Sequence, residues 1–281
     1  MALQAKENEK HSDGQAERAL ILWQSYLTGD HSHLGVQVRT VRRIFKHLPS
    51  SPRCLVCNAP FQGIGGKVVS LFGFGVGRSS FNPRLCGRCE ILVKQHQVGT
   101  EVPLTLLFAD VRGSTTLAEE IGASAFHHLI NRFYTTSTEI LVQTGALIEK
   151  MIGDEVAGIY VPGIAGPDHT HNAVEAARSL LKATGYADPG GPWIQVGAGV
   201  HTGIAYVGAV GSNQLVSDIT VLGDVANTAA RLASQARAGE ILVSEEACHA
   251  AGLNLDHCEL RQLQLKGRSQ PTTVRVIGVQ D

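Results

Sequence analysis

The stretch 104–115 reads LTLLFADVRGST, a polar turn directly after a strongly apolar run. We predict a buried β-strand at 103–109, because a short continuous apolar run bounded by a turn is typical of one. The run ends at Asp110, and a Gly-Ser-Thr turn beginning at Gly113 leads into a helix. The Asp110 carboxylate is therefore expected at the exposed end of the strand, where the N–H groups of the turn can cradle a phosphate.

Strands and helices alternate along the rest of the chain from about residue 101. Two of the expected strands are joined by Gly153-Asp154, a dipeptide typical of hairpin turns. The expected elements are strands at 103–109, 147–152, 156–161, 194–200, 204–210, 241–243 and 274–279, and helices at 126–140, 171–184 and 225–237. The order βαββαβ at the centre predicts an α+β fold of the ferredoxin-like type, with extra strands appended.

Three local features are expected within this part of the chain. Thr116 and Glu119 have the spacing of a capping box, which would start a helix. The sequence His201-Thr202-Gly203 is expected to turn the chain between two paired strands. His169 and His171 show no metal-ligand spacing and are expected in a solvated loop.

A second acidic residue, Asp154, lies at the tip of the first hairpin. In a split βαβ sheet these strands lie beside the one that ends at Asp110, so both carboxylates can converge on one point. Two carboxylates near phosphate oxygens suit Mg²⁺, which keeps several waters and takes few protein ligands. Either aspartate alone is typical of an ordinary turn. Their pairing is what indicates a metal site.

The composition limits what kind of protein this is. Apolar residues make up 43% and charged residues 17% of the 281 positions, which excludes global disorder. No run approaches the ~18 apolar residues of a membrane span. The charged segment 1–10 lacks the apolar stretch of a signal peptide. We therefore expect a cytoplasmic, reducing location and no membrane span.

Charge divides the chain unevenly. Residues 1–98 hold 13 Lys and Arg against 6 Asp and Glu, a net +7, whereas residues 99–281 hold the remaining 11 and 19, a net −8. Such a split indicates at least two functional units. We expect an N-terminal helical region at 1–49, a four-cysteine module at 50–98 and an α+β domain at 99–281.

The N-terminal region is predicted to form two helices, at 12–28 and 34–48. Each carries an apolar stripe, and Pro49 ends the second. A helical hairpin packed on its neighbour is the simplest interpretation. The alternative is a partner-binding or dimerising stripe.

Four of the six cysteines form two closely spaced pairs, Cys54-x-x-Cys57 and Cys86-x-x-Cys89. In a reducing compartment such pairs indicate ligands before disulfides. Four thiolates favour a tetrahedral zinc ion. An iron–sulfur cluster uses the same ligands, and independent buried or redox-active thiols are the third possibility. The other two cysteines lack this spacing and are expected in the core: Cys248 and Cys258.

Several short motifs follow one another along the segment 104–278. They are Phe108–Thr115, Lys150–Asp154, Gly199–Gly203 with Gly208 and Gly211, Thr220–Arg231, and Lys266-Gly267. Each alone is common, but in this order they resemble the motifs of the class III nucleotidyl cyclases. In that family the first two carry metal-binding aspartates, the third forms a central hairpin and the last two contact the reacting phosphates.

The resemblance implies two Mg²⁺ or Mn²⁺ ions, held by Asp110, Asp154 and the Val111 carbonyl. The turn Gly113-Ser114-Thr115 would cradle the phosphates, and Lys266 would meet the terminal ones. One metal ion can lower the pKa of the ribose 3′-hydroxyl, while the second neutralises the leaving group.

The resemblance also implies how the nucleotide is read. Arg231 would stabilise the charge that grows on the transferring phosphoryl group, and Asn227, one turn earlier, would orient the ribose. Lys150 can donate to N1 of adenine and Thr220 can accept from its amino group. Guanine would instead want a carboxylate in place of the lysine. Thr220 stands where many relatives have aspartate, so the chain resembles the threonine-containing subgroup.

These observations predict an adenylate cyclase that converts ATP into 3′,5′-cyclic AMP and pyrophosphate, with the N-terminal region as regulator or dimer brace. In the family's architecture the site forms between two chains, so a homodimer is implied. One chain would supply the metal residues and the other would supply Lys150, Thr220, Asn227 and Arg231. The alternatives are a guanylate cyclase, a catalytically silent nucleotide sensor and a nucleic-acid binder. The acidic segment 99–281 would repel a phosphate backbone, so no nucleic-acid partner is expected.

Overall fold

The computed structural model describes residues 2–34, 36–49, 52–54, 56–71, 77–79, 85–96, 98–212 and 216–280. The chain forms two compact units. The larger unit comprises residues 103–205 and 222–281, and the smaller comprises residues 1–102 and 206–221. Two long strands, β1 (Gly99–Val111) and β4 (Val196–Ser212), belong to both units.

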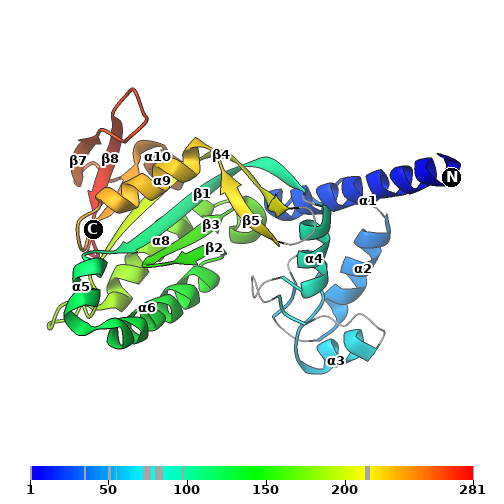
Figure 1. The fold of residues 1–281 in the computed structure, drawn as a ribbon, viewed down its shortest axis with the longest axis horizontal. Helices are drawn as coiled ribbons and strands as arrows, with labels where there is room; N and C mark the ends of the chain where they lie inside the picture. Colours follow the sequence, from blue (N-terminus) through cyan, green and yellow to red (C-terminus); the bar gives the residue numbers. More distant parts are fainter. Residues whose placement is uncertain are drawn as a thin grey trace. The chain divides into compact units, whose positions relative to one another are not determined.

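The larger unit is built on a mixed β-sheet (Figure 1). Among the described residues, its strands lie in the order β2-β3-β1-β4-β6-β8-β7. The bounds of the other strands are β2 (Leu147–Ile152), β3 (Glu155–Tyr160), β6 (Ile241–Ser244), β7 (Glu259–Leu263) and β8 (Thr272–Ile277). β1 and β3 are antiparallel, whereas β4 and β6 are parallel. This confirms the predicted α+β fold with appended strands.

Helices cover both faces of this sheet. Alternate residues of a strand point to opposite faces, and β6 follows this rule. Ile241 and Val243 belong to the main core, whereas Leu242 packs with Leu232 of the helix α9 (Asp224–Gln235). The helices of the larger unit are α5 (Ser114–Ile121), α6 (Ala123–Gln143), α7 (Pro162–Ala165), α8 (His169–Leu181), α9 (Asp224–Gln235) and α10 (Glu245–Ala251). A π-helical turn, Lys182–Tyr186, continues α8.

The predicted hairpin at residues 201–203 is wrong, because β4 passes through these residues without a turn. Glycine suggested a turn, but here it allows a close approach between β4 and α9. A Cβ atom on Gly203 would lie 2.7 Å from Cγ2 of Val225, and one on Gly199 would lie 2.3 Å from the backbone N of Ala233. Glycine within a strand often serves this purpose.

Two smaller expectations are also wrong. The helix α5 begins at Ser114 with Gly113 as its N-cap and without a side-chain cap, so Thr116 and Glu119 form no capping box. His169 starts α8 and is not in a solvated loop. Its Nδ1 lies 3.2 Å from Oγ1 of Thr105, and burial lowers its pKa. The sequence also did not predict α10 and β7.

The smaller unit contains four helices among its described residues: α1 (Ala2–Thr28), α2 (Val36–His47), α3 (Gly63–Leu71) and α4 (Gly87–His96). It also contains β5 (Val216–Leu222, of which Leu222 belongs to the larger unit), which pairs with β4. Trp23 of α1 is fully buried and donates from Nε1 to the Val207 carbonyl of β4 at 2.9 Å. The helix α1 is therefore attached to the end of β4.

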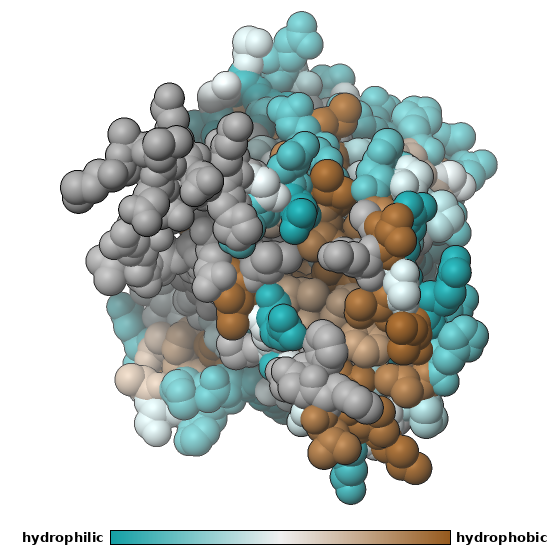
Figure 2. All heavy atoms as spheres, turned by 90° about the vertical axis from the view of Figure 1, so that its right-hand side faces the viewer, coloured by the Kyte–Doolittle hydropathy of each residue, from teal (hydrophilic) through white to brown (hydrophobic). Residues whose placement is uncertain are grey.

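The inner and outer sides of α2 differ in character. Phe45 packs with Ala59 and Val69 in a small hydrophobic core that joins α2 to α3. Ile44 and Arg43 lie on the exposed side. Figure 2 shows hydrophobic side chains gathered beside hydrophilic ones on the face that it draws. The exposed large apolar residues of the smaller unit include Val36, Ile44, Ile64, Leu71, Ile91 and Val210.

Candidate active site and candidate metal centre

Asp110 and Asp154 lie next to each other at one end of the sheet. The register places Asp110 opposite Glu155 of β3, and the Val111 N–H donates to the Asp154 carbonyl at 3.1 Å. Burial raises the pKa of Asp110, the Arg112 charge lowers it, and the charge and hydrogen bond of Asp154 raise it again. A half-buried carboxyl group whose ionisation is opposed by a neighbouring carboxylate favours a bound cation.

Arg112, which the sequence analysis did not single out, holds this strand end in place. Its guanidinium forms an ion pair with the Asp110 carboxylate. It also donates to the Ser234 carbonyl at 2.9 Å and to the Ala236 carbonyl at 3.4 Å, both at the end of α9. Arg112 lies in the turn directly after β1, two positions from Asp110, and this short spacing is the sequence signal that relates the two residues.

The predicted phosphate turn follows directly. Gly113 has a φ of 68°, a left-handed conformation that glycine adopts without strain. Its carbonyl accepts from the Leu117 N–H at 2.9 Å, which starts α5. Ser114 is half-buried and Thr115 exposed. The N-terminus of α5 thus opens beside Asp110 and can receive an anionic group.

Tyr134 is a second residue that the sequence analysis missed. Its hydroxyl donates to the Gly153 carbonyl at 2.9 Å, and burial together with the Asp154 charge raises its pKa. The bond fixes the turn that presents Asp154. Tyr134 and Gly153 also line a cavity of about 530 Å³ along α5 and α6.

The helix α9 carries Asn227 and Arg231 one turn apart. Asn227 is exposed and Arg231 half-buried. A Cβ atom on Gly267 would lie 3.6 Å from Nη2 of Arg231, so the turn with the exposed Lys266 lies beside this guanidinium. The structure therefore brings two distant predicted phosphate contacts together.

The predicted base-reading residues lie in different parts of the chain. Lys150 is in β2 beside an irregularity in its register with β3, and its side chain is outside the described atoms. Thr220 lies on β5 in the smaller unit and is half-buried.

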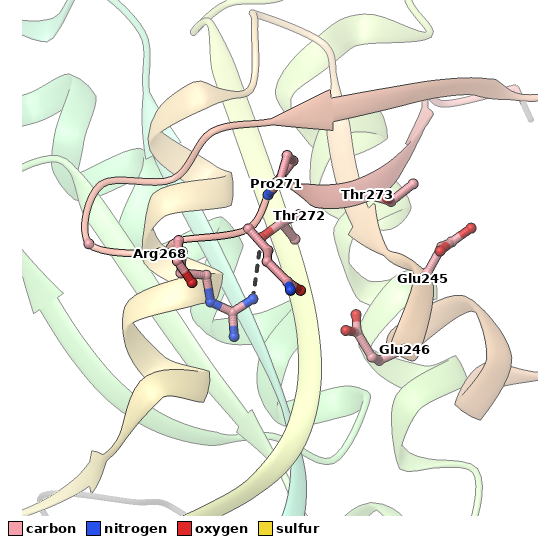
Figure 3. Close-up of a pocket in the computed structure, with 9 residues that line it drawn as sticks. Glu245, Glu246, Arg268, Pro271, Thr272 and Thr273 are labelled. Atoms are coloured by element: carbon pink, nitrogen blue, oxygen red, sulfur yellow. Dashed lines mark hydrogen bonds between the residues drawn. The ribbon is translucent and has the colours of Figure 1, made fainter.

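A polar cleft of about 470 Å³ lies near the start of α9, between the segment 267–273 and α10 (Figure 3). Arg268 forms an ion pair with Asp224 of α9 and donates to Oγ1 of Thr272 at 3.2 Å. Glu245 and Glu246 line the opposite side. This arrangement fixes the turn that carries Lys266.

The four paired cysteines form a single cluster in the smaller unit. The four Sγ atoms all lie within 4.8 Å of one another, and Sγ of Cys57 is 3.7 Å from Sγ of Cys86. The Cys86 N–H donates to Sγ of Cys54 at 3.3 Å, and the Cys89 N–H donates to Sγ of Cys86 at 3.4 Å. Backbone donors of this kind stabilise thiolates. The four cysteines lie close enough to hold a metal ion.

The charge of this cluster explains why a cation fits it. Hydrogen bonds from the other three thiols lower the pKa of Cys54, whereas Cys54 and Cys86 raise the pKa of Cys57. The thiols therefore do not all ionise together without a positive charge among them. A tetrahedral ion such as zinc removes this conflict, and an iron–sulfur cluster uses the same donor set.

Residues 97–278 match the family described as the adenylate and guanylate cyclase catalytic domain. The chain belongs to this family. Among the described residues, no helix has the length and apolar character needed to cross a bilayer.

Named relatives include adenylate cyclases from two bacteria. One from Anabaena cylindrica is 30% identical over 140 residues, covering 46% of this chain and 26% of the relative. One from Mycobacterium tuberculosis is 29% identical over 178 residues, covering 62% of this chain and 39% of the relative. The matched segment thus spans less than two fifths of either relative.

Two solved structures share the fold. The guanylyl cyclase Cya2 has a TM-score of 0.56 and 25% identity, covering 64% of this chain and 94% of that chain. The adenylyl cyclase CyaB from P. aeruginosa has a TM-score of 0.55 and 29% identity, covering 64% and 95%. The similar structures thus include cyclases with different base specificities.

Proposed function

We propose that this chain is an adenylate cyclase that converts ATP into 3′,5′-cyclic AMP and pyrophosphate. The observation that supports this most is the pair Asp110 and Asp154 at the start of α5, where two carboxylates and a helix N-terminus meet. That combination suits a triphosphate with its divalent cations. The approach of Arg231 to the turn carrying Lys266 adds a cationic surface for the phosphates.

Asp110, Asp154 and the Val111 carbonyl would hold two Mg²⁺ or Mn²⁺ ions. Such ions activate the attacking hydroxyl and neutralise the leaving group when bound. The residues fit this role because burial and Asp154 disfavour an isolated charge on Asp110. Arg112 would keep the Asp110 carboxylate oriented.

The chain's own donors would then position the nucleotide. The N–H groups of Gly113, Ser114 and Thr115 would bind phosphate oxygens, and Lys266 would bind the terminal ones. Arg231 would donate to the transferring phosphoryl group as negative charge grows there. Asn227, one turn away on α9, would orient the ribose.

The choice of ATP rests on Lys150 and Thr220. A lysine donates only, and a threonine hydroxyl can accept, so the pair complements N1 and the amino group of adenine. A guanylate cyclase is the competing function, because the similar solved structures include the guanylyl cyclase Cya2.

The site would form between two copies of the chain. We propose a homodimer with two equivalent sites, in which one subunit supplies the aspartates. Its partner would supply Lys150, Thr220, Asn227 and Arg231. A two-fold arrangement makes both sites identical.

Purified protein incubated with Mn²⁺ and either ATP or GTP provides the test of the activity. Cyclic AMP from ATP, lost in Asp110→Asn, is the expected result. Cyclic GMP from GTP as the main product would replace the proposal by a guanylate cyclase. Nucleotide binding without any cyclic product would indicate a silent sensor.

We also propose a structural zinc ion at Cys54, Cys57, Cys86 and Cys89. The closeness of the four Sγ atoms supports this. Metal analysis of the purified protein is expected to find about one zinc per chain, and the protein should be colourless. Stoichiometric iron with a brown visible absorption would assign an iron–sulfur cluster instead.

A further inference from the structure

Arg42 of α2 faces the four-cysteine cluster. Its Nη1 donates to the carbonyl of Val56, which lies between the first two cysteines. Burial lowers the pKa of Arg42, while the negative charges of Cys57, Cys54 and Cys89 raise it. The guanidinium is therefore within electrostatic reach of at least three of the four sulfur atoms.

The charge of a filled cluster makes this position important. Four thiolates around a divalent ion carry a formal charge of about −2. A partly buried anion of this kind needs a counter-charge nearby, and arginine provides one without losing its proton. The neighbouring Arg43 lies on the exposed side of α2, so the two adjacent arginines differ in what they contact.

The other end of the Arg42 guanidinium reaches toward α1. Nη2 lies 3.0 Å from Nε2 of His31, and Nδ1 of His31 lies 2.6 Å from Oγ of Ser25. Arginine can only donate, so Nε2 of His31 accepts. The proton of the neutral imidazole is then on Nδ1, which donates to Ser25.

Ser25 belongs to the part of α1 that holds the strand ends of the smaller unit. Trp23 donates to the Val207 carbonyl of β4 at 2.9 Å. Gln24 donates to Oγ1 of Thr100 in β1 at 3.2 Å. β4 pairs with β5, the strand that carries Thr220. A continuous series of contacts therefore runs from the cysteines to the strand pair with the proposed base-reading residue.

We infer that Arg42 is the counter-charge of the metal centre and links metal occupancy to the docking of α1 on β4. Loss of the ion lets the cysteine loops separate, which withdraws the Val56 carbonyl and the negative charge from Arg42. His31 and Ser25 then lose their fixed partner. The consequence for Thr220 rests on the proposed cyclase function, whereas the link between the metal and Trp23 does not.

The experiment uses the two tryptophans of the chain. In full-length Trp193→Phe protein loaded with Zn²⁺, Trp23 is the remaining tryptophan and reports the docking of α1. Removing zinc with a chelator is expected to shift its emission to the red and to increase quenching by acrylamide. In Arg42→Met, zinc should leave about 10-fold faster, and Trp23 should be more accessible even with zinc bound.

Two variants make the result specific. Arg43→Met removes an exposed arginine from the same helix and should behave like the parent protein. His31→Ala breaks the link beyond Arg42, so it should release zinc at the parent rate while Trp23 no longer responds to chelation. This variant also tests the link if Arg42→Met fails to fold.

Three results would overturn the inference. The first is that the protein binds neither Zn²⁺ nor Co²⁺. The second is that the Arg42→Met protein releases zinc at the parent rate. The third is that the emission of Trp23 does not change when zinc is removed by the chelator. None of these measurements uses cyclase activity. A protein that couples zinc to Trp23 but makes no cyclic nucleotide would contradict the proposed function alone.

Discussion

The two candidate metal sites of this chain are built on opposite principles. In the larger unit, Asp110 and Asp154 offer a few oxygen ligands at an open strand end, so phosphates and water must complete the coordination. In the smaller unit, four thiolates supply a complete tetrahedron, which closes the site to other ligands. The first arrangement suits metal ions that take part in a reaction, and the second suits an ion that stabilises structure.

Each site also pairs its anionic ligands with one arginine that is not itself a proposed ligand. Arg112 contacts Asp110 and the end of α9, and Arg42 faces the cysteines and reaches His31. In both sites, the arginine connects the ligand groups to a second element: Arg112 to the end of α9, and Arg42 to His31 in the segment after α1. This common feature suggests that the two centres are positioned by the same electrostatic means.

The largest expected effect is a loss of cyclase activity that leaves the four-cysteine site unchanged. Asp110→Ala and Arg231→Ala should each reduce cyclase activity by ~10³-fold or more, because one removes a metal ligand and the other a donor to the transferring phosphoryl group. Zinc content should not change in either variant. Arg237→Ala, an exposed arginine just after α9, is the control. Loss of zinc from Asp110→Ala would show that the two sites are not independent.

The same two variants test the dimer. Mixed and allowed to exchange, half of the dimers combine one chain of each kind if pairing is random. Each such dimer has one site with both defects and one with neither, so activity should recover to about a quarter of the parent value. Exchange is verified by differently tagged chains. No recovery despite exchange would mean that each site is built within a single chain.

Cys54→Ser should affect the smaller unit alone. Removal of one thiolate should abolish stoichiometric zinc and destabilise the residues around it, because structural zinc contributes directly to folding. Trp23 reports the smaller unit and Trp193 the larger unit, so single-tryptophan variants can follow each unfolding transition in urea. Cys258→Ser, in the core of the larger unit, should leave zinc content unchanged. A larger shift at Trp193 than at Trp23 would contradict this assignment.

Much of both sites could be predicted from local sequence. The apolar run before Asp110, the Gly153-Asp154 turn and the cysteine spacing each depend on neighbouring residues, and the structure places each of these in the expected kind of element. The continuous strand β4 was not predicted, because Gly199 and Gly203 serve contacts with α9 that are distant in sequence. Local patterns cannot distinguish a turn glycine from one that permits close packing.

The arginines and Tyr134 were missed for a related reason. Arg112 meets carbonyls more than 120 positions away, and the Tyr134 hydroxyl meets the Gly153 carbonyl. Such partners become visible only when the strands and helices are assembled. The proposed ligands of each centre therefore follow from local sequence patterns, whereas the residues that position those ligands do not.

A moderate effect should reveal whether Arg112 orients Asp110. Arg112→Met keeps much of the side-chain volume but removes the ion pair, and residues that support metal ligands typically change affinity or activity by ~10- to 100-fold. We expect about 10-fold more Mn²⁺ to be needed for half-maximal activity. Arg132→Met, on the exposed side of α6, is the control. An unchanged Mn²⁺ requirement would mean that Arg112 only connects the end of β1 to α9 and does not orient Asp110 for the metal.

The smallest expected effect is a response of the larger unit to acid, which chelation of zinc should not alter. His201 is 4% exposed, and its Nδ1 lies 2.8 Å from Oγ of Ser244. Burial lowers its pKa, the Glu246 and Asp224 charges raise it, and the Arg268 charge lowers it. Because the net shift is downward, the unfolded chain takes up a proton more readily than the folded one as the pH falls below 6.5. The contribution of His201 to the free energy of unfolding is therefore present above pH 6.5 and is lost as the pH falls through the folded-state pKa.

Urea unfolding of His201→Gln, followed at Trp193 in a Trp23→Phe background, measures this contribution. Glutamine does not titrate and can still form a hydrogen bond with Ser244, so the variant should lose less stability than the parent between pH 7.5 and pH 5.5. His249→Gln is the matched control, because His249 is exposed on the neighbouring helix α10. An identical pH dependence in His201→Gln and the parent would mean that other groups cause the acid sensitivity. If the pH dependence of unfolding of the larger unit disappeared when zinc is removed, the stability of that unit would depend on the four-cysteine site. The two units would then not be independent.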